Sequence, residues 1–189
     1  KGGVAGVIVN TIDRAQKLAA KFSGQVDMLV LHSAFISADR FKLEKKLEQA
    51  IGKNARRPDR LVVIGTQVLE QSLDIDFDVL FTDIAPIDLL LQRAGRLHRH
   101  AISRPVGLTA PRLVVAGIDG PCHYQDGSVA VYGQYLLMKT EAVLPQSINL
   151  PDDISRLVQQ VYDLRRDPPL EGIDQAKADI ASLLQQIAD

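Results

Sequence analysis

Short apolar runs alternate with stretches of helical periodicity from the start of the chain to about residue 117. Runs rich in β-branched residues predict five strands, near residues 4–9, 26–31, 61–64, 79–81 and 113–115. Apolar residues at spacings of three and four predict helices over residues 12–22, 37–51 and 86–97. Strands that alternate with helices in this way are typical of an α/β fold, in which helices cover both faces of a parallel sheet.

Residues at the ends of these helices support the boundaries. Thr11 or Asp13 can cap the first helix, and Ser23-Gly24 should end it. Gly52 should end the second helix, and Pro86 suits the first turn of the third.

The pattern loosens after Gly117. Residues 117–127 are rich in Gly, Pro and Asp and predict a loop. Helices are expected over residues 131–141, 152–163 and 173–188. We therefore expect an α/β lobe over residues 1–118. Residues 119–189 should form a loop and a helical extension that packs on the lobe and leads to a further C-terminal domain.

Composition narrows the possible partners and compartments. The 189 residues carry a formal net charge of −1, so any nucleic-acid binding must come from local patches. A single cysteine, Cys122, excludes an internal disulfide framework. No apolar run approaches the roughly 20 residues of a membrane span, and no signal peptide opens the chain. Because the chain opens almost directly with a strand and lacks an initiator methionine, we expect it to be part of a longer protein.

A cluster of basic and polar side chains lies at the end of the third predicted helix and just after it. It comprises Gln92, Arg93, Arg96, His98, Arg99 and His100. Guanidinium groups match phosphate oxygens, and arginines at spacings of three on a helix would point the same way. The alternative is a solvated basic face at a helix C-terminus, where cations are favoured. The stretch 61–100 also carries a strand, a polar Thr-Gln turn and a buried acidic pair, so a phosphate-directed role is the hypothesis to test.

Polar residues also follow almost every predicted strand, as Asn10-Thr11, His32-Ser33, Thr66-Gln67 and Asp83. Ligands of open parallel sheets bind outside the carboxyl ends of the strands, so together these residues predict a rim for a phosphate backbone. Taken alone, each is better explained as a turn or a cap, and Thr11 in particular as a cap. A basic run between residues 40 and 60 is interpreted as a solvated helix face and loop; its members are Arg40, Lys42, Lys45, Lys46, Lys53, Arg56, Arg57 and Arg60.

The sequence contains no phosphate-binding loop. GxxxxGK[ST] is absent, and KGGVAG at the start falls short of GxGxxG and precedes a strand instead of following one. Arginines directed at phosphate without a nucleotide cradle would have to act on a nucleotide held elsewhere, as arginine fingers do. Cys122, His123, His98 and His100 match no standard zinc spacing, so no metal site is expected.

With these residues in view, the chain resembles the second RecA-like domain of superfamily 2 helicases. Within that superfamily it is similar to the CRISPR-associated helicase–nuclease of type I systems, the enzyme that Cascade recruits. Residues 63–78 resemble motif V of the family, residues 92–100 motif VI and residues 31–40 motif IV. The later segments 131–144 and 150–163 also look like this family, and the fold implied is a RecA-like lobe followed by a helical C-terminal extension.

The resemblance implies roles on the nucleotide side. Arg96 and Arg99 match the motif VI arginines that reach across the interdomain cleft to the phosphates of ATP. Gln92 matches the glutamine near the γ-phosphate and its attacking water. Asp74 matches the motif V acid near the ribose. Arg93 is expected to form a structural salt bridge.

On the nucleic-acid side, the resemblance places Thr66 on the backbone of single-stranded DNA. His32 and Ser33 lie in motif IV, and Thr11 joins them at the rim. Ala34 stands where the family commonly has arginine, so one phosphate or acidic-partner contact is expected to be absent.

The function implied is that of the C-terminal motor lobe of an ATP-dependent DNA translocase in antiviral defence, acting in the prokaryotic cytoplasm. ATP and Mg²⁺ would be held mainly by an N-terminal RecA-like lobe, and single-stranded DNA, an HD nuclease domain and Cascade would be its other partners. Alone, the chain is expected to lack ATPase activity. Two alternatives remain open: a lobe of a DEAH-like RNA helicase, which shares Glu70 and Ser72, and a binding module without catalysis.

Overall fold

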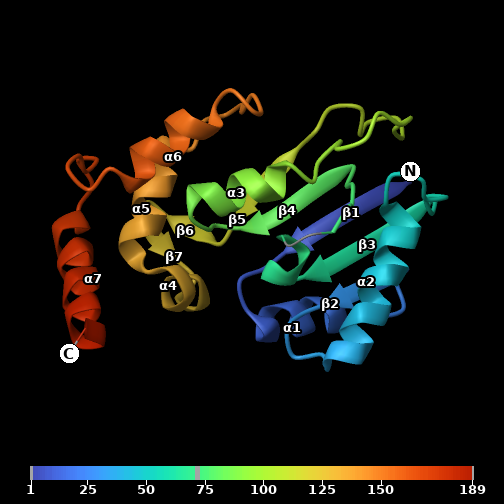
Figure 1. Cartoon of the computed structure of the whole chain (residues 1–189), viewed down its shortest axis with the longest axis horizontal. Coiled ribbons are helices and arrows are strands. Elements are labelled where there is room, and N and C mark those ends of the chain that lie inside the picture. Colours follow the sequence, from blue (N-terminus) through green and yellow to red (C-terminus); the bar gives the residue numbers. More distant parts are fainter. Residues whose placement is uncertain (1, 71–72, 189) are drawn as a thin grey trace. The chain divides into compact units, whose positions relative to one another are not determined.

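The computed structural model describes residues 2–70 and 73–188 and divides them into two compact units (Figure 1). The first unit falls within residues 1–83 and 92–116, and the second within residues 84–91 and 117–189. Ser72, which belongs to the pattern shared with DEAH-like RNA helicases, lies outside the described residues.

A five-stranded parallel sheet forms the centre of the first unit. Its strands are β1 (Gly3–Ile8), β2 (Met28–Leu31), β3 (Arg60–Gly65), β4 (Val79–Asp83) and β5 (Leu113–Ala116). They lie in the order β2-β3-β1-β4-β5, and every neighbouring pair is parallel. All five strands therefore present their carboxyl ends at the same edge, which confirms the α/β class expected from the sequence.

Two helices of this unit cover opposite faces of the sheet. Helix α1 (Ile12–Phe22) packs Ala15 against Val9 and Ile64, on one side of the pleat. Helix α2 (Ser37–Ile51) packs Leu47 and Ile51 into the larger core on the other side, which includes Val4, Ile8, Leu31, Leu61, Val63 and Leu80. Thr11 caps α1 by accepting a hydrogen bond from the Arg14 backbone N–H, and Gly52 follows the last residue of α2. Both helix boundaries were predicted.

The backbone at the end of β3 leaves no room for a side chain. A Cβ at Gly65 would lie 2.5 Å from the carbonyl oxygen of Leu31 and 2.7 Å from a methyl group of Leu69. Glycine at this position lets β2 and β3 approach where the chain turns into a 3₁₀ helix over Gln67–Glu70.

The part of the sheet beside α1 keeps some apolar surface open. A cavity of about 350 Å³ is lined by residues that include Val7, Leu18 and Phe22. Phe81 on β4 remains 42% exposed. The segment between α3 (Ile87–Ala94) and β5 is also open at its tip, where Val106 is 97% exposed.

The second unit contains a short hairpin and helices. Strands β6 (Ile118–Gly120) and β7 (His123–Tyr124) pair antiparallel, so the prediction of a plain loop over residues 117–127 was wrong. Gly/Pro-rich composition hid a hairpin whose turn includes Cys122 in the left-handed region, with φ 59°. The predicted helix over 131–141 was also wrong in its bounds. Gly133, with φ 77°, separates α4 (Asp126–Tyr132) from α5 (Gln134–Val143).

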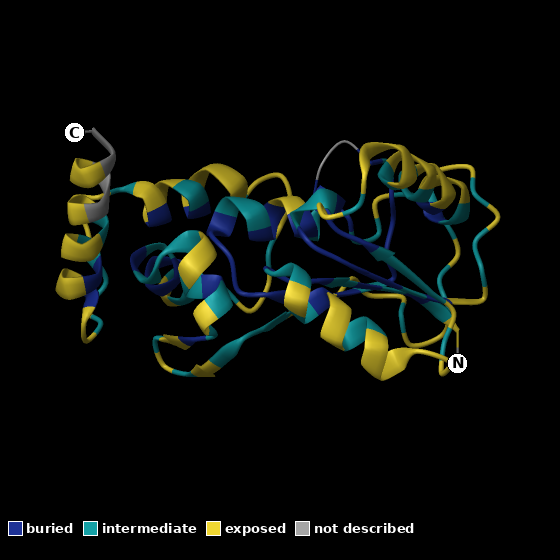
Figure 2. Cartoon of the chain, turned by 90° about the horizontal axis from the view of Figure 1, so that it is seen from below, coloured by how far each residue is buried: buried dark blue, intermediate teal, exposed yellow. Residues whose placement is uncertain are grey.

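Helices α6 (Ile154–Tyr162) and α7 (Ile173–Ala188) complete this unit close to the predicted bounds. Its core joins Leu157 and Val161 of α6 to Ile87 and Leu91, the part of α3 that belongs to this unit. Figure 2 shows exposed residues along most of α7 at the C-terminal end.

A buried lysine connects α5 to the segment before α7. The Lys139 ammonium, 1% exposed, donates hydrogen bonds to the carbonyl oxygens of Asp163 and Arg166 and lies 3.3 Å from the Asp167 carboxylate. Asp167 also accepts hydrogen bonds from Lys177 and from the Tyr135 hydroxyl, which hold its pKa down at about 2.

Candidate nucleotide-facing site

The chain leaves α3 earlier than the apolar pattern predicted. Helix α3 ends at Ala94, not Leu97, because the following backbone pairs with the strand-like segment around Phe77. The Phe77 N–H donates to the Arg96 carbonyl at 2.8 Å, and the His98 N–H donates to the Phe77 carbonyl at 3.2 Å. His98 turns the chain with a left-handed φ of 46°. Arg93, Arg96 and Arg99 therefore do not share one helix face, and the prediction that they point the same way was wrong.

Arg93 is part of the protein's interior. Its side chain is fully buried, and its Nε donates to Glu70 Oε1 at 2.7 Å. The guanidinium also donates to the Thr82 hydroxyl and, at 3.0 Å, to the Asp83 carbonyl. The structural salt bridge expected for Arg93 is present.

Arg96 points inward as well, toward two main-chain carbonyls. Its guanidinium donates to the carbonyl oxygen of Glu70 at 2.8 Å and to that of Leu73. Burial lowers the pKa of Arg96, the nearby Arg99 lowers it further, and Asp74 opposes the change. An arginine in this setting stays charged. The positive charge of Arg96 is therefore bound by neutral carbonyl groups and not by a carboxylate.

Arg99 and Asp74 form an exposed pair. Arg99 Nε lies 3.0 Å from Asp74 Oδ1, and the two side chains are 44% and 48% exposed. His100 Nε2 lies 3.1 Å from the same oxygen, although the two atoms are not aligned for a hydrogen bond. Gln92, on α3, is exposed. An exposed guanidinium beside an exposed carboxylate can exchange its partner for a phosphate and a hydroxyl at little cost.

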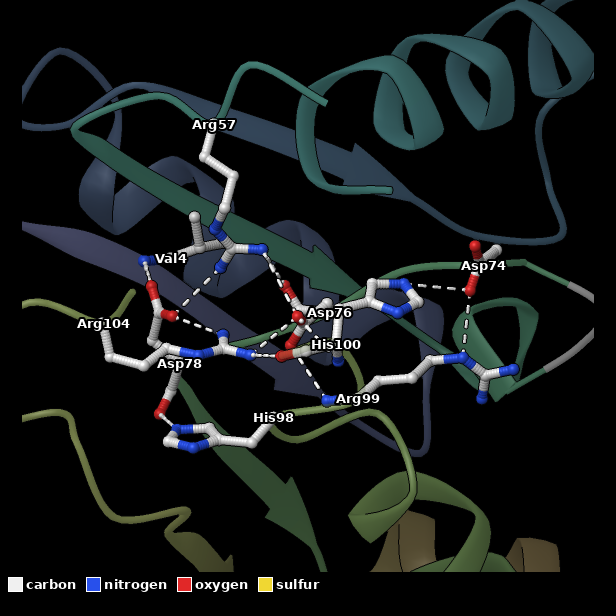
Figure 3. Close-up of polar contacts among 9 residues, drawn as sticks. All are labelled: Val4, Arg57, Asp74, Asp76, Asp78, His98, Arg99, His100 and Arg104. Atoms are coloured by element: carbon white, nitrogen blue, oxygen red, sulfur yellow. Dashed lines mark hydrogen bonds and ion pairs between the residues drawn. The ribbon is translucent and has the colours of Figure 1, made fainter. Parts of the chain in front are cut away.

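A buried ion network lies beside this pair (Figure 3). Asp76 and Asp78 are 0% and 2% exposed. Arg104 bridges them, because its Nη2 lies 2.7 Å from the Asp76 carboxylate and its Nη1 lies 2.7 Å from the Asp78 carboxylate. Arg57 donates to Asp78 Oδ1 at 3.1 Å and to the Asp76 carbonyl at 2.8 Å. The Val4 N–H donates to the other Asp78 oxygen at 2.6 Å.

Hydrogen bonding decides the protonation of Asp78 and Arg104. Burial by itself raises the pKa of Asp78, but hydrogen bonds from Arg104 and Val4 and the charge of Arg57 outweigh it, so the pKa lies below its ordinary value. Burial lowers the pKa of Arg104, and the two carboxylates more than compensate. Both partners stay ionised.

The sequence indicated an acidic pair here but not its partners. The prediction that Arg57 belongs to a solvated basic run is wrong, because its side chain is only 17% exposed and donates to the Asp76 carbonyl and the Asp78 carboxylate. Arg104 lies outside every motif that the sequence indicated. The available signal was the alternation of Asp74, Asp76 and Asp78 with apolar residues, which in an extended segment places the three acids on one face and so predicts basic partners beside them.

At the carboxyl edge of the sheet, the expected nucleic-acid residues differ in exposure. Ser33 is exposed, whereas Thr66 and His32 are 2% and 6% exposed. His32 stacks on Phe35 with ring centroids 4.4 Å apart, and its buried Nδ1 has no hydrogen-bond partner among the described residues. The Thr11 hydroxyl is engaged as the cap of α1.

Asp83, at the end of β4, lies at the same edge of the sheet and binds residues of the first unit. Its carboxylate accepts hydrogen bonds from the Asn10 N–H at 3.1 Å and from Arg14 Nε at 3.0 Å. Burial raises its pKa above the ordinary value, although the Asn10 N–H and the charges of Arg14 and Arg93 oppose the rise. Asp83 is therefore occupied by structural partners.

Across residues 2–70 and 73–188, no three His, Cys, Asp or Glu side chains gather as a metal site would require. Over the same residues, no helix combines the length and apolar character needed to span a bilayer.

Comparison with known proteins gives one consistent family. The family model described as CRISPR-associated nuclease/helicase Cas3, C-terminal, matches residues 1–102. The CRISPR-associated nuclease/helicase Cas3 of Streptococcus thermophilus is 54% identical over 165 residues, which are 86% of this chain and 18% of that protein.

Solved structures agree. The T. fusca Cas3-ATP crystal structure matches with a TM-score of 0.86 at 34% identity, covering 99% of this chain and 22% of that one. A chain of a CRISPR RNA-guided surveillance complex, pre-nicking, matches with a TM-score of 0.84 at 33% identity, covering 97% and 23%. These matches confirm the RecA-like fold, and the chain spans about a fifth of the length of such relatives.

Proposed function

Since this chain belongs to the family of the C-terminal part of the CRISPR-associated nuclease/helicase Cas3, we propose that it is the C-terminal motor lobe of an ATP-dependent translocase on single-stranded DNA. The observation that carries the proposal is the pairing of Arg99 with Asp74. Both side chains are about half exposed and engage each other, beside the buried, carbonyl-bound Arg96. No nucleotide-holding loop accompanies them in the sequence.

The residues present fit a nucleotide presented by another lobe. We propose that Arg99 and Arg96 neutralise phosphate charge that develops during hydrolysis, that Asp74 accepts hydrogen bonds from ribose hydroxyls, and that Gln92 orients the attacking water. Phosphoryl transfer depends on positioning and charge neutralisation, and one arginine finger contributes about 10³–10⁵ in rate. Mg²⁺, when bound, would add charge neutralisation at the phosphates, and it would be held by the other lobe.

Hydrolysis in such an arrangement depends on two lobes meeting. Because the arginines and the phosphate loop lie on separate lobes, hydrolysis requires that the cleft between them closes. We propose that the missing partners are an N-terminal RecA-like lobe and an HD nuclease domain, and that Cascade recruits the whole protein in the prokaryotic cytoplasm. In this scheme, residues 1–118 are the motor lobe, and residues 119–189 lead to a further C-terminal domain.

The DNA contact belongs at the carboxyl edge of the sheet. We propose that Ser33, Thr66, His32 and Thr11 serve there, with Ser33 as the exposed member. Side-chain contact by Thr66 and His32 requires that this edge opens, because both are more than nine-tenths buried. Contacts to the phosphate backbone carry no base code, so binding should be independent of sequence and sensitive to salt.

The experiment is ATP hydrolysis by the intact helicase that contains this chain. We expect Arg99→Ala and Arg96→Ala to lower hydrolysis by about 10³-fold or more while binding of single-stranded DNA stays within about twofold. Arg112→Ala, at an exposed arginine of the same unit, serves as the control and should keep full activity. Retained hydrolysis in Arg99→Ala would remove the finger assignment. Stimulation by RNA instead of DNA would favour a DEAH-like RNA helicase.

A further inference from the structure

Asp76 has an unusual set of partners. One carboxylate oxygen accepts the backbone N–H of Arg99 and the other that of His100, each at 3.2 Å. Arg104 donates to the same carboxylate at 2.7 Å and to the His100 carbonyl at 2.9 Å. The side chain of a fully buried acid thus holds the main chain of the residue proposed as the finger.

Asp76 is in turn held from the other side. Arg104 extends its second Nη to Asp78, and Arg57 joins the Asp78 carboxylate to the Asp76 carbonyl. Asp78 accepts the N–H of Val4 at the start of β1, so the network is anchored to the central strand of the sheet. The segment 98–104 has no helix or strand of its own, and these side chains replace the missing backbone ladder.

The charges of the network balance. Two carboxylates and two guanidinium groups cancel, and three of the four side chains are at most 6% exposed. A buried network of this kind is a poor source of stability compared with an apolar core of similar volume. Its contribution is a fixed geometry, because forked guanidinium groups and carboxylates with two acceptor oxygens set both the distances and the angles between the groups.

The geometry fixes where Arg99 projects. Residues 96–98 run parallel to the segment around Phe77, and Asp76 holds the next two N–H groups. Asp74 lies two residues before Asp76 and therefore meets the Arg99 side chain in the observed pair. A shift of this segment would move the guanidinium away from any ligand that replaces Asp74.

We propose that Asp76 is a positioning residue for ATP hydrolysis. It sets the main chain at Arg99, and Arg104 orients its carboxylate. The inference rests on the proposed function, because Asp76 is proposed to act only by positioning Arg99. Asp76 touches neither nucleotide nor DNA and acts through the finger alone.

The test is Asp76→Asn in the intact helicase, because the amide keeps the shape of the carboxylate but turns one acceptor into a donor. We expect kcat for DNA-stimulated ATP hydrolysis to fall by about tenfold or more, since a displacement near 1 Å at a reacting group costs up to about 10²-fold. KM for ATP should change by less than about twofold, because the lost interaction is made in the transition state.

Asp167→Asn is the matched control. Asp167 also binds two cationic side chains, but it belongs to the other unit. We expect this variant to lose thermal stability and to keep kcat within about twofold. If Asp76→Asn keeps its kcat, or if both variants lose kcat in proportion to melting temperature, the positioning role is wrong.

Two further arms separate the possible failures. If Asp76→Asn does not fold, Arg104→Lys replaces it, because lysine keeps the charge but cannot bridge both carboxylates. We expect this variant to lower kcat several-fold with KM for ATP unchanged; an unchanged kcat overturns the inference. Retained hydrolysis in Arg99→Ala would defeat the proposed function and this inference together. Loss in Arg99→Ala with normal kcat in Asp76→Asn would defeat the inference alone.

Discussion

Two ion pairs within one short stretch of sequence occupy opposite environments. Arg93 and Glu70 are 0% and 6% exposed, and further hydrogen bonds to Thr82 and Asp83 surround them. Arg99 and Asp74 are 44% and 48% exposed and hold mainly each other. The first pair joins the last residue of the 3₁₀ helix to α3, and the second joins the segment after the 3₁₀ helix to the segment after α3.

The difference shows which pair can work on a ligand. If the buried Arg93 guanidinium moved away from Glu70, both charges would be left without a partner of opposite charge where no water can solvate them. The Arg93–Glu70 pair must therefore stay formed. An exposed pair is already partly hydrated and gives little free energy, so a phosphate can replace one partner. Arg96 lies between these cases, buried like Arg93 but bound to neutral carbonyls.

The largest expected effect is on the buried pair. Glu70→Ala leaves the Arg93 guanidinium buried without its carboxylate and should lower the free energy of unfolding by about 3–5 kcal/mol. Urea unfolding of the chain measures this loss, with Asp74→Ala as the matched removal of an exposed acid. Equal losses in the two variants would erase the distinction between the pairs.

Arg96→Ala should have an intermediate effect on stability. It leaves the carbonyl oxygens of Glu70 and Leu73 without the donor they have now, which costs about 1–3 kcal/mol if water does not replace it. The same urea titration applies, with Arg112→Ala as an exposed control. A loss as large as that of Glu70→Ala would show that Arg96 belongs with the structural arginines.

Asp167, in the second unit, extends the comparison to an acid that is 18% exposed. Its folded pKa of about 2 lies below the ordinary 3.8, because Lys177 and Tyr135 donate to it. The unfolded chain therefore takes up this proton first on acidification, and the stabilisation is lost as the pH falls from about 4 to about 2. Unfolding measured across that range should show a shallower acid loss in Asp167→Asn; an identical slope would contradict the assignment.

The smallest effect is expected at the exposed pair. Asp74→Asn should change the free energy of unfolding by less than about 1 kcal/mol, because both groups are hydrated. High salt should reduce even this difference, since ions screen exposed charges within roughly 10 Å. Urea titrations at low and high salt check both points, and a larger, salt-resistant loss would mean that the pair is structural after all.

Much of the first unit could be predicted because its signals are local. Strands appeared as β-branched runs, and Gly52, Ser23 and Thr11 marked helix ends by chemistry that acts within a few residues. The end of α3 could not be predicted, because apolar spacing continues to Leu97 while the backbone there pairs with Phe77. That competition is visible only in three dimensions.

The residues of the site also fall into those that the sequence could predict and those that it could not. Arg93 was recognised as structural, but the burial of Arg96 and the recruitment of Arg57 and Arg104 depend on residues 20 or more positions apart in most contacts. In the second unit, Gly133 broke a helix that apolar spacing made continuous. Composition alone made residues 117–127 look irregular, although they pair as a hairpin.

The exposed tip at Val106 offers a place for an optical reporter. Its side chain is 97% exposed and lies outside every helix and strand. The single native thiol, Cys122, is only partly exposed, and burial together with the charge of Glu141 raises its pKa, so little of it is the reactive thiolate at neutral pH. In this chain, a thiol-specific dye on Val106→Cys would therefore react mostly at the tip, which would give a fluorescence-transfer donor for testing the proposed closure of the cleft.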